Sequence, residues 1–461
     1  MSTIASPSPI GQSFRKIFTR EQVEQTARRT GFLQRQSKLD VYLFALTLAV
    51  AAVSAQRWSY SQIAAVVHAL GGPLVSAQAI EQRLDNGLAV DLLSDLGSQL
   101  AKQMAQTTLS IGVQPDCFQA FPAIWATDST ILPLAPILAP TWPGSGGSAS
   151  PASLKGHFTI DVWSGSTWSY RLTQGTEADS LGPVLQDAPQ GTLHLIDQGY
   201  SKSRVALSQI DRAQQYFLTP LWLPSPLYLD KDRRLDLQEL IRQSEATGRV
   251  DQWVWLGPPG QPGSFRVRLV GFVLPPQIVE QRRRRVYKQA RKNQRVPQPQ
   301  TLLLKSWMFF LTNAPLAMLS FEAVCCLYRL RWQVELLFKR FKSLLGLRTM
   351  SVYKKEPSVT CQVVAALLAA MMLDEVQEAA YHAWTPGTQR EPSLYRMTAL
   401  LLRLGPLLMW ALVCEVQPQR AGSILERIGQ ILHKLGRMEK RKRRSSRQAL
   451  FDLQLPTVVC A

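Results

Sequence analysis

The stretch YRLRWQVELLFKRFK, residues 328–342, holds one carboxylate among several cationic side chains. Apolar residues recur through it at three- and four-residue spacing, which predicts an amphipathic part of a longer helix from about Ser320 to Leu345. At about 100° per residue, four polar side chains fall within a band of roughly 60° beside the apolar side. These four are Tyr328, Arg331, Glu335 and Lys342.

The four-residue stripe is about 21 Å long at a rise of about 1.5 Å per residue, which is too long to surround one metal ion. It suits a single carboxylate at a reaction centre, with cationic and hydroxyl groups along the helix holding a chain of phosphates. A simpler interpretation remains open. Glu335 is four residues from both Arg331 and Lys339, so it could serve only as an ion-pair partner that stabilises the helix.

Composition narrows the function classes. The chain has 461 residues, 46% of them hydrophobic, and a formal net charge of +19. A protein this basic usually binds a polyanion, so DNA, RNA and an anionic membrane are the candidates. The apolar stretch at residues 41–55 is shorter than the ~18–20 residues of a membrane span, so we expect a buried helix there and no membrane partner.

The ends and the cysteines point to the cytoplasm. The N-terminal residues lack the basic-then-apolar order of a signal peptide. The cysteines show no CxxC spacing, so we expect reduced core residues rather than zinc ligands or disulfides. Their positions are Cys117, Cys325, Cys326, Cys361, Cys414 and Cys460.

Local patterns divide the chain into helical and mixed regions. Residues 59–70 and 76–86 predict two short helices with serine N-caps and a Gly-Gly-Pro turn between them. A DNA-binding helix-turn-helix and a plain helical hairpin both fit this outline. From residue 121 onward the sequence pattern predicts strands, a helix and further strands, which indicates an α/β region. Residues 357–435 are expected to be mostly helical.

Two aspartates stand at the predicted ends of apolar strands, Asp128 in WATDST and Asp197 in LIDQGY. An acid at a strand end can project into a cleft, although strand-end aspartates often only start turns. Together with Glu335 they would supply carboxylate oxygens for two divalent cations about 3.5–4 Å apart, which activate the nucleophile and stabilise the leaving oxygen in phosphodiester chemistry.

These motifs resemble the bacterial DDE transposases of the insertion-sequence-four type, whose signature is Tyr-x2-Arg-x3-Glu-x6-Lys. Tyr328, Arg331, Glu335 and Lys342 match this signature in full, and Asp128 and Asp197 match its two aspartate motifs. The resemblance extends over about residues 30–440. It implies an α/β ribonuclease-H-like catalytic core with a β-rich insertion, flanked by helical N- and C-terminal domains.

The implied domains are a helical DNA-binding domain, a core in two parts around the insertion with its basic helix, and a helical region with a basic tail. The expected boundaries are 1–110 for the helical DNA-binding domain and 353–461 for the helical region with the basic tail. The core is expected at 111–220 and 301–352, and the insertion with its basic helix at 221–300.

The resemblance also assigns roles. Asp128, Asp197 and Glu335 would be the catalytic metal ligands for two Mg²⁺ ions, for which Mn²⁺ can substitute. Tyr328, Arg331 and Lys342 would contact phosphates near the end of the mobile element. An aromatic residue on the strand that contains Trp307 stacks on a flipped base in hairpin-forming relatives, and simple strand packing is the alternative for Trp307.

Relatives often carry a basic residue near the place where this chain has Pro220, so a DNA contact there would be either missing or supplied by Arg233 or Arg234. The basic stretch at residues 281–295 predicts a helix against the DNA backbone, with a merely solvated face as the alternative. Its candidate DNA contacts are Arg282, Arg285, Lys288 and Arg291. Residues 437–447 would form a basic arm that adds non-specific affinity.

The expected function is cut-and-paste transposition: metal-dependent strand cleavage and 3′-hydroxyl strand transfer at terminal inverted repeats. The partners would be double-stranded DNA, both element ends and target, and a second copy of the chain in a homodimeric complex. The protein would act in the bacterial cytoplasm, associated with the nucleoid. A catalytically silent DNA-binding regulator and a ribonuclease-H-like nuclease without strand transfer are the alternatives.

Overall fold

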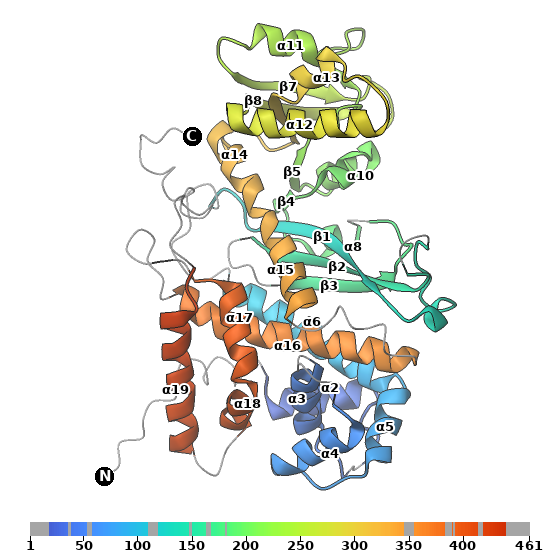
Figure 1. Cartoon of the computed structure of the whole chain (residues 1–461), viewed down its shortest axis with the longest axis vertical. Helices are drawn as coiled ribbons and strands as arrows, with labels where there is room; N and C mark the ends of the chain where they lie inside the picture. Colours follow the sequence, from blue (N-terminus) through green and yellow to red (C-terminus); the bar gives the residue numbers. More distant parts are fainter. Residues whose placement is uncertain are drawn as a thin grey trace. The chain divides into compact units, whose positions relative to one another are not determined.

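The chain packs as two compact units, and each is described by itself. The first contains residues 1–112, 129–178 and 333–443, and the second contains residues 113–128, 179–332 and 444–461. Figure 1 shows the elements in chain order. The computed structural model describes residues 18–35, 38–52, 58–108, 119–146, 150–162, 167–179, 182–344, 355–382, 390, 392–413 and 418–438.

Some expectations therefore lie outside the described residues. They are the first 17 residues of the expected helical domain 1–110, most of the basic arm at 437–447, and Cys117, Cys414 and Cys460.

The N-terminal helices of the first unit agree with the sequence pattern. Ser59 caps one of the two expected short helices in a reciprocal capping box with Gln62, and Ser76 caps the other through the amide of Ala79. The apolar stretch from residue 41 is a helix with almost all of its side chains buried, as predicted. The helices are α2 (Arg20–Arg29), α3 (Val41–Ala52), α4 (Tyr60–Ala69), α5 (Ala77–Asp85) and α6 (Leu88–Thr108).

The C-terminal part of the first unit is helical, as expected. Its central helix, α16, packs against α3 and α6. Residues 356–374 of α16 are long and apolar enough to cross a membrane, a feature that sequence reasoning missed, but 78% of the apolar window is buried. This burial is that of a core helix. The helices are α16 (Glu356–His382), α17 (Leu394–Arg403), α18 (Gly405–Val413) and α19 (Pro418–Leu435).

One strand, β1 (Ile124–Pro133), passes from the second unit into the first after Asp128. In the first unit it is followed by a short 3₁₀ helix, η1 (Pro136–Leu138), and by an antiparallel hairpin of β2 (Ser153–Asp161) and β3 (Thr167–Gln174). The hairpin side chain Phe158 packs on Phe338 and Phe341 of helix α15. The apolar residues of the signature stretch therefore cover this hairpin.

The second unit is built on a sheet in the order β1-β4-β5-β9-β8-β7-β6. Its first three strands are parallel, and the others pair antiparallel. Short helices α9 (Gln198–Ser201) and α10 (Arg204–Arg212) connect β4 to β5 and contact β5, and Figure 1 shows α10 beside this strand. The strands are β4 (Leu193–Leu195), β5 (Tyr216–Pro220), β6 (Leu227–Tyr228), β7 (Arg249–Leu256), β8 (Phe265–Val273) and β9 (Trp307–Thr312).

Strands β6, β7 and β8 come from the region where the sequence predicted short strands between two parts of the core. They extend the sheet beyond β9 and share one buried core with β5 and β9, formed by residues such as Phe217, Val254, Val267 and Leu311. The helices of this unit are α8 (Gly182–Asp187), α9 (Gln198–Ser201), α10 (Arg204–Arg212), α11 (Leu237–Gln243), α12 (Pro276–Lys292) and α13 (Pro299–Leu304).

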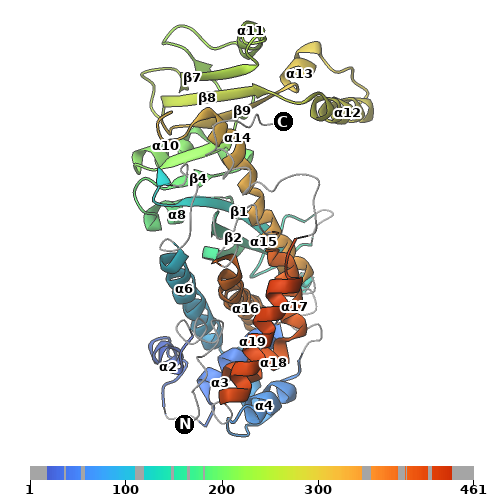
Figure 2. The same ribbon diagram turned by 90° about the vertical axis from the view of Figure 1, so that its left-hand side faces the viewer.

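The basic stretch forms α12, and none of its residues is buried. Figure 2 shows α12 next to α13, where β8 ends and β9 begins. The arginine-rich helix is therefore a surface element of the second unit, attached to the sheet along one side.

The single helix predicted for residues 320–345 is wrong in one respect. Ser320 does cap its start, but the helix is divided into α14 (Phe321–Leu330) and α15 (Trp332–Ser343). Arg331, between them, keeps helical angles (φ −51°, ψ −31°) while its N–H bonds to the carbonyl of Tyr328, three residues earlier. This tighter turn interrupts the regular ladder, so angles calculated for one straight helix do not carry across Arg331.

Candidate active site

The strand register brings the two aspartates level with each other. Ile124 pairs with Leu193, and Ala126 pairs with Leu195, on the parallel strands β1 and β4. Asp128 and Asp197 each lie two residues beyond the last of these pairs, so both come just past the paired ends of two adjacent parallel strands. The prediction that Asp128 ends its strand is wrong, because β1 continues to Pro133. It lies instead just beyond the last residue at which β1 pairs with β4.

Asp197 is the N-cap of α9. Its Oδ1 accepts hydrogen bonds from the backbone N–H groups of Gly199 at 2.8 Å and Tyr200 at 3.3 Å. Its own carbonyl accepts a hydrogen bond from Thr219 Oγ1 on β5. These contacts fix both the backbone and the carboxylate of Asp197, and they orient one of its carboxylate oxygens.

Gly199 leaves the space that the Asp197 carboxylate uses. A Cβ atom at position 199 would lie 2.9 Å from Asp197 Oδ1 and 3.4 Å from Oδ2. The first distance is shorter than real Cβ contacts, so a side chain there requires either the carboxylate or α9 to move. Gly199 is therefore a positioning residue for Asp197.

Arg331 lies against the other aspartate. Its Nη1 donates to Asp128 Oδ2 at 3.0 Å, and the two side chains are only 13% and 21% exposed. Partial burial of this pair strengthens the attraction relative to an ion pair in open water. The Arg331 guanidinium also stands 5.9 Å from the centre of the Tyr328 ring.

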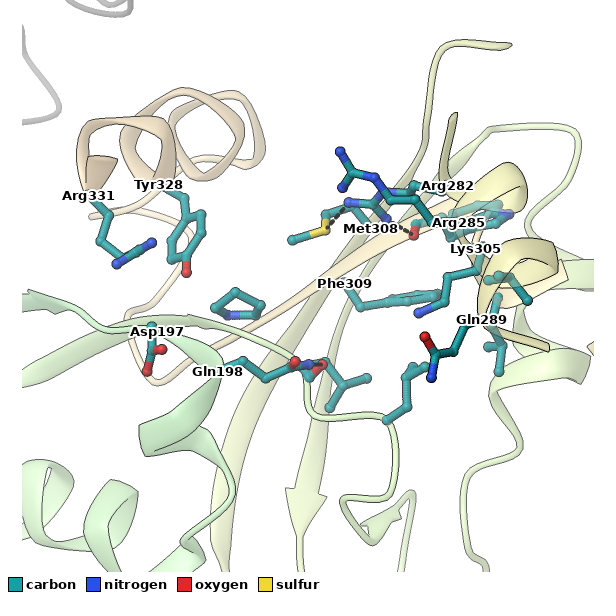
Figure 3. Close-up of a pocket in the computed structure, with 16 residues that line it drawn as sticks. Asp197, Gln198, Arg282, Arg285, Gln289, Lys305, Met308, Phe309, Tyr328 and Arg331 are labelled. Atoms are coloured by element: carbon teal, nitrogen blue, oxygen red, sulfur yellow. Dashed lines mark hydrogen bonds between the residues drawn. The ribbon is translucent and has the colours of Figure 1, made fainter. Parts of the chain in front are cut away.

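Tyr328 connects this pair to the sheet. Its ring packs on Phe310 of β9, with centroids 4.9 Å apart. Figure 3 shows its hydroxyl group directed toward Asp197, with Arg331 beside it. Burial raises the pKa of Tyr328, and the negative charges of Asp197 and Asp128 raise it further, while Arg331 opposes them. The phenol therefore stays protonated and can donate a hydrogen bond.

The donor set fits a magnesium ion. Mg²⁺ is usually held by one or two protein carboxylates, with water and substrate phosphate oxygens in its other positions. Asp128 and Asp197 supply such a pair on neighbouring strands. In the described part of the chain, no group of three or more His, Cys, Asp or Glu side chains is arranged to hold a metal ion. A third carboxylate ligand therefore remains a prediction.

Glu335 and Lys342 both lie on α15 in the first unit, Glu335 in its first turn and Lys342 in its last. Both residues are partly buried, while the neighbouring apolar residues Val334, Leu337 and Phe341 are buried. The predicted position beside the apolar side of the helix agrees with this burial. Their roles as metal ligand and phosphate contact stay predictions.

A pocket of about 630 Å³ opens between the aspartate end of the sheet and α12, all within the second unit. Figure 3 shows Arg282, Arg285 and Lys305 gathered at the end of the pocket opposite Asp197, Tyr328 and Arg331. The cationic end suits a phosphate, and the apolar floor suits a base or sugar. Pro220 also lines this pocket, at the place where relatives were expected to carry a basic residue.

Trp307 lines the same pocket but is only 4% exposed. Its ring stacks on Phe309, with centroids 5.8 Å apart and planes at 12°, inside the core of the second unit. This environment favours the strand-packing interpretation of Trp307. Trp332, next to Arg331, is 57% exposed and was not singled out from the sequence.

The predicted DNA contacts on α12 differ in their surroundings. Arg282 donates to the backbone carbonyl of Trp307 and toward Met308 Sδ, both at 3.3 Å. Burial and the neighbouring charge of Arg285 lower the pKa of Arg282. Arg285, Lys288 and Arg291 are exposed. Arg282 therefore attaches the helix to β9, and the other three face solvent.

Arg233 and Arg234, the suggested substitutes for a contact near Pro220, are both exposed. Arg233 forms an ion pair with Asp230 at 3.2 Å.

Sequence reasoning missed Gly199 and Lys305. A signal for Gly199 was present, because a glycine two residues after an aspartate that caps a helix leaves room for the carboxylate. Lys305 offered no local signal, since only the tertiary structure brings it beside Arg282 and Arg285.

A family model described as "Transposase DDE domain" matches residues 119–372, which is more than half of the chain and includes Asp128, Asp197 and Glu335. The chain belongs to the DDE transposase family. It is a transposase, an enzyme that binds DNA and catalyses DNA transposition.

Curated relatives from bacterial insertion sequences extend the likeness over most of the transposase. The chain is 24% identical over 451 residues to the transposase for insertion sequence element IS231E of Bacillus thuringiensis, covering 94% of this chain and 91% of the relative. It is 26% identical over 362 residues to the transposase for IS421 of Escherichia coli, covering 77% of this chain and 90% of the relative.

Among solved structures, a cryo-EM structure of the piggyBac transposase synaptic complex with hairpin DNA is similar. It is 10% identical, with a TM-score of 0.39, and the match covers 92% of this chain and 87% of that one.

Proposed function

We propose that the protein is the cut-and-paste transposase of a bacterial insertion sequence of the insertion-sequence-four type. It would cleave DNA at terminal inverted repeats and join the resulting 3′-hydroxyl ends to target DNA. The observation that carries the proposal is that Asp128 and Asp197 each follow the last β1–β4 pair by two residues, while Arg331 of the signature bonds to Asp128 and stands over Tyr328.

Asp128, Asp197 and Glu335 are the proposed catalytic triad of carboxylates, and they would hold two Mg²⁺ ions. When bound, the ions supply an activated water or 3′-hydroxyl nucleophile and stabilise the leaving oxygen. The fixed capping geometry of Asp197 supports its role as a ligand. A ribonuclease-H-like core is supported by the parallel strands β1, β4 and β5 and by the hairpin β2–β3 that follows β1.

The protein's own cations and hydroxyl groups would hold the DNA. Tyr328 keeps its proton because of burial, so its hydroxyl would donate to a phosphate oxygen near the reaction centre. Lys342 would contact the strand along the signature stretch. Arg285, Lys288 and Arg291 on α12 are exposed and would follow the backbone as positioning contacts, which carry no sequence information themselves.

The proposed partners are the two ends of the element, the target DNA and a second copy of the chain in the DNA complex. Bacterial insertion-sequence transposases act in the cytoplasm on chromosomal DNA, and we propose association with the nucleoid for this chain. The formal charge of +19 supports general attraction to DNA.

The test is a cleavage and strand-transfer assay with the full chain. The substrate is a duplex that contains the boundary of the element, with Mg²⁺ or Mn²⁺ added. Wild type is expected to release 3′-hydroxyl ends and to join them to target DNA. Glu335→Gln, Asp128→Asn and Asp197→Asn should each abolish cleavage while DNA binding persists. Wild-type DNA binding without cleavage would favour a silent regulator, and cleavage without joining would favour a nuclease.

A further inference from the structure

The ion pair between Arg331 and Asp128 raises a question that phosphate binding alone does not answer. If the only role of Arg331 were to contact a DNA phosphate, we would expect its side chain to be exposed to solvent in the protein without DNA. Here its guanidinium donates to a carboxylate proposed to hold a metal ion, at 3.0 Å and with little exposure of either side chain.

The surroundings make this arrangement specific. The Arg331 guanidinium stands 5.9 Å from the centre of the Tyr328 ring, which is fixed against Phe310, and the Tyr328 hydroxyl is directed toward Asp197 (Figure 3). The signature therefore places one positive charge beside a pair of carboxylates on neighbouring strands. Without that charge, the two carboxylates would repel each other across the short distance between strands.

We propose that Arg331 is an internal counter-ion of Asp128 in the metal-free protein and that an incoming divalent cation displaces it, releasing the guanidinium for a DNA phosphate. This inference rests on the proposed function, since it assumes that Asp128 is a metal ligand. Arg331 would thus act first as a positioning residue for the carboxylates and then as a DNA contact.

The physical reason is competition for one carboxylate. A divalent ion bound to Asp128 would lie within a few ångströms of the guanidinium nitrogen that now bonds to Oδ2, and like charges at such a distance repel strongly when partly buried. A phosphate oxygen removes this repulsion by accepting the released guanidinium. Bound metal then raises the affinity for DNA, and bound DNA raises the affinity for the metal by the same factor.

The decisive experiment measures the affinity of the full-length protein for Mn²⁺ without DNA, by calorimetry or electron paramagnetic resonance. Removing the competing cation in Arg331→Gln should tighten Mn²⁺ binding by roughly five- to tenfold, the size expected for one partly buried ion pair. A purely structural role for Arg331 predicts the opposite sign, because a disordered site would bind Mn²⁺ more weakly.

Arg329→Gln is the matched control. Arg329 lies two residues away on α14 and is exposed, so this variant loses the same charge without touching Asp128. It should bind Mn²⁺ as wild type does. Arg331→Lys keeps a positive charge and should restore most of the weaker, wild-type affinity. Equal or weaker Mn²⁺ binding by Arg331→Gln would overturn the proposal, as would equal tightening by Arg329→Gln.

A second experiment needs no metal. With chelator present, Asp128→Asn should tighten DNA binding because it releases Arg331, and this gain should disappear when Arg331 is already glutamine. A double-mutant cycle separates this coupling from the general loss of negative charge. Additive effects in the cycle would refute the counter-ion role.

Failure of the inference is distinguishable from failure of the proposed function. Wild type that binds Mn²⁺ and cleaves element ends, together with an unchanged Arg331→Gln affinity, would reject only the counter-ion role. Absence of cleavage with any divalent cation would reject the proposed function itself.

Discussion

Gly199→Ala is the substitution that tests the site most directly, because it adds one methyl group beside a proposed metal ligand. The new Cβ atom would lie 2.9 Å from Asp197 Oδ1 in the present geometry. The carboxylate must rotate away or α9 must shift. Either movement disturbs the hydrogen bonds from the amides of Gly199 and Tyr200 that now orient Oδ1.

The expected effects on stability and on catalysis differ in size. Loss of an N-cap interaction costs about 0.5–2 kcal/mol, while replacing a helical glycine by alanine returns about 0.5–1 kcal/mol, so the unfolding free energy should fall by at most about 1.5 kcal/mol. A displacement of the carboxylate by about 1 Å can lower a rate by about 100-fold, equivalent to about 2.7 kcal/mol in the barrier.

The assay compares single-turnover cleavage of an end-containing duplex with urea unfolding of the same variant. Gly422→Ala is the matched control, because Gly422 is a glycine in helix α19 where an added Cβ atom would meet no described atom within 4 Å. It should cleave at the wild-type rate. Wild-type cleavage by Gly199→Ala would show that the Asp197 carboxylate needs no such fixed position, and the reasoning would then be wrong.

Four further outcomes are expected. Trp307→Ala should lower the unfolding free energy by about 3–5 kcal/mol because the ring is buried, and Trp307→Phe should lower it by less. An unchanged urea midpoint for Trp307→Ala would contradict the packing role. Lys342→Ala should weaken binding to end DNA and lower the slope of its salt dependence by about 1, whereas an equal slope would exclude a phosphate contact. Arg340→Met should destabilise by about 3–5 kcal/mol because it removes the cation bonded to buried Asp374, and changing Asp374 to leucine as well should recover much of the loss in thermal unfolding. Burial lowers the pKa of His194 to about 4, so the unfolded chain takes up a proton at a higher pH than the folded chain does. This difference should lower the unfolding free energy by roughly 2 kcal/mol between pH 7.5 and pH 5. Urea titrations at both pH values check this, and His194→Gln should remove this contribution to the pH dependence of stability.

Much of the local structure could be predicted because neighbouring residues determine it. Serine caps marked the starts of α4, α5 and α14, a continuous apolar run marked the buried helix α3, and apolar spacing marked the buried side of α15. The aspartate motifs were visible because each follows a short apolar run. The division of the long helix at Arg331 was not predictable, because it depends on one tight turn within an otherwise helical pattern.

Sequence alone therefore determined which residues carry charge and where most of the capped or strongly apolar helices lie. Only the tertiary structure decided what each charge does. Arg331 and Arg340 are nine residues apart in the same basic stretch, yet one is paired with Asp128 at the proposed site and the other with buried Asp374 in the core. Likewise, the level positions of Asp128 and Asp197 follow from the register of β1 on β4, which joins segments about 70 residues apart. Partners this distant in the chain are chosen by sheet register and helix packing, and no local pattern specifies them.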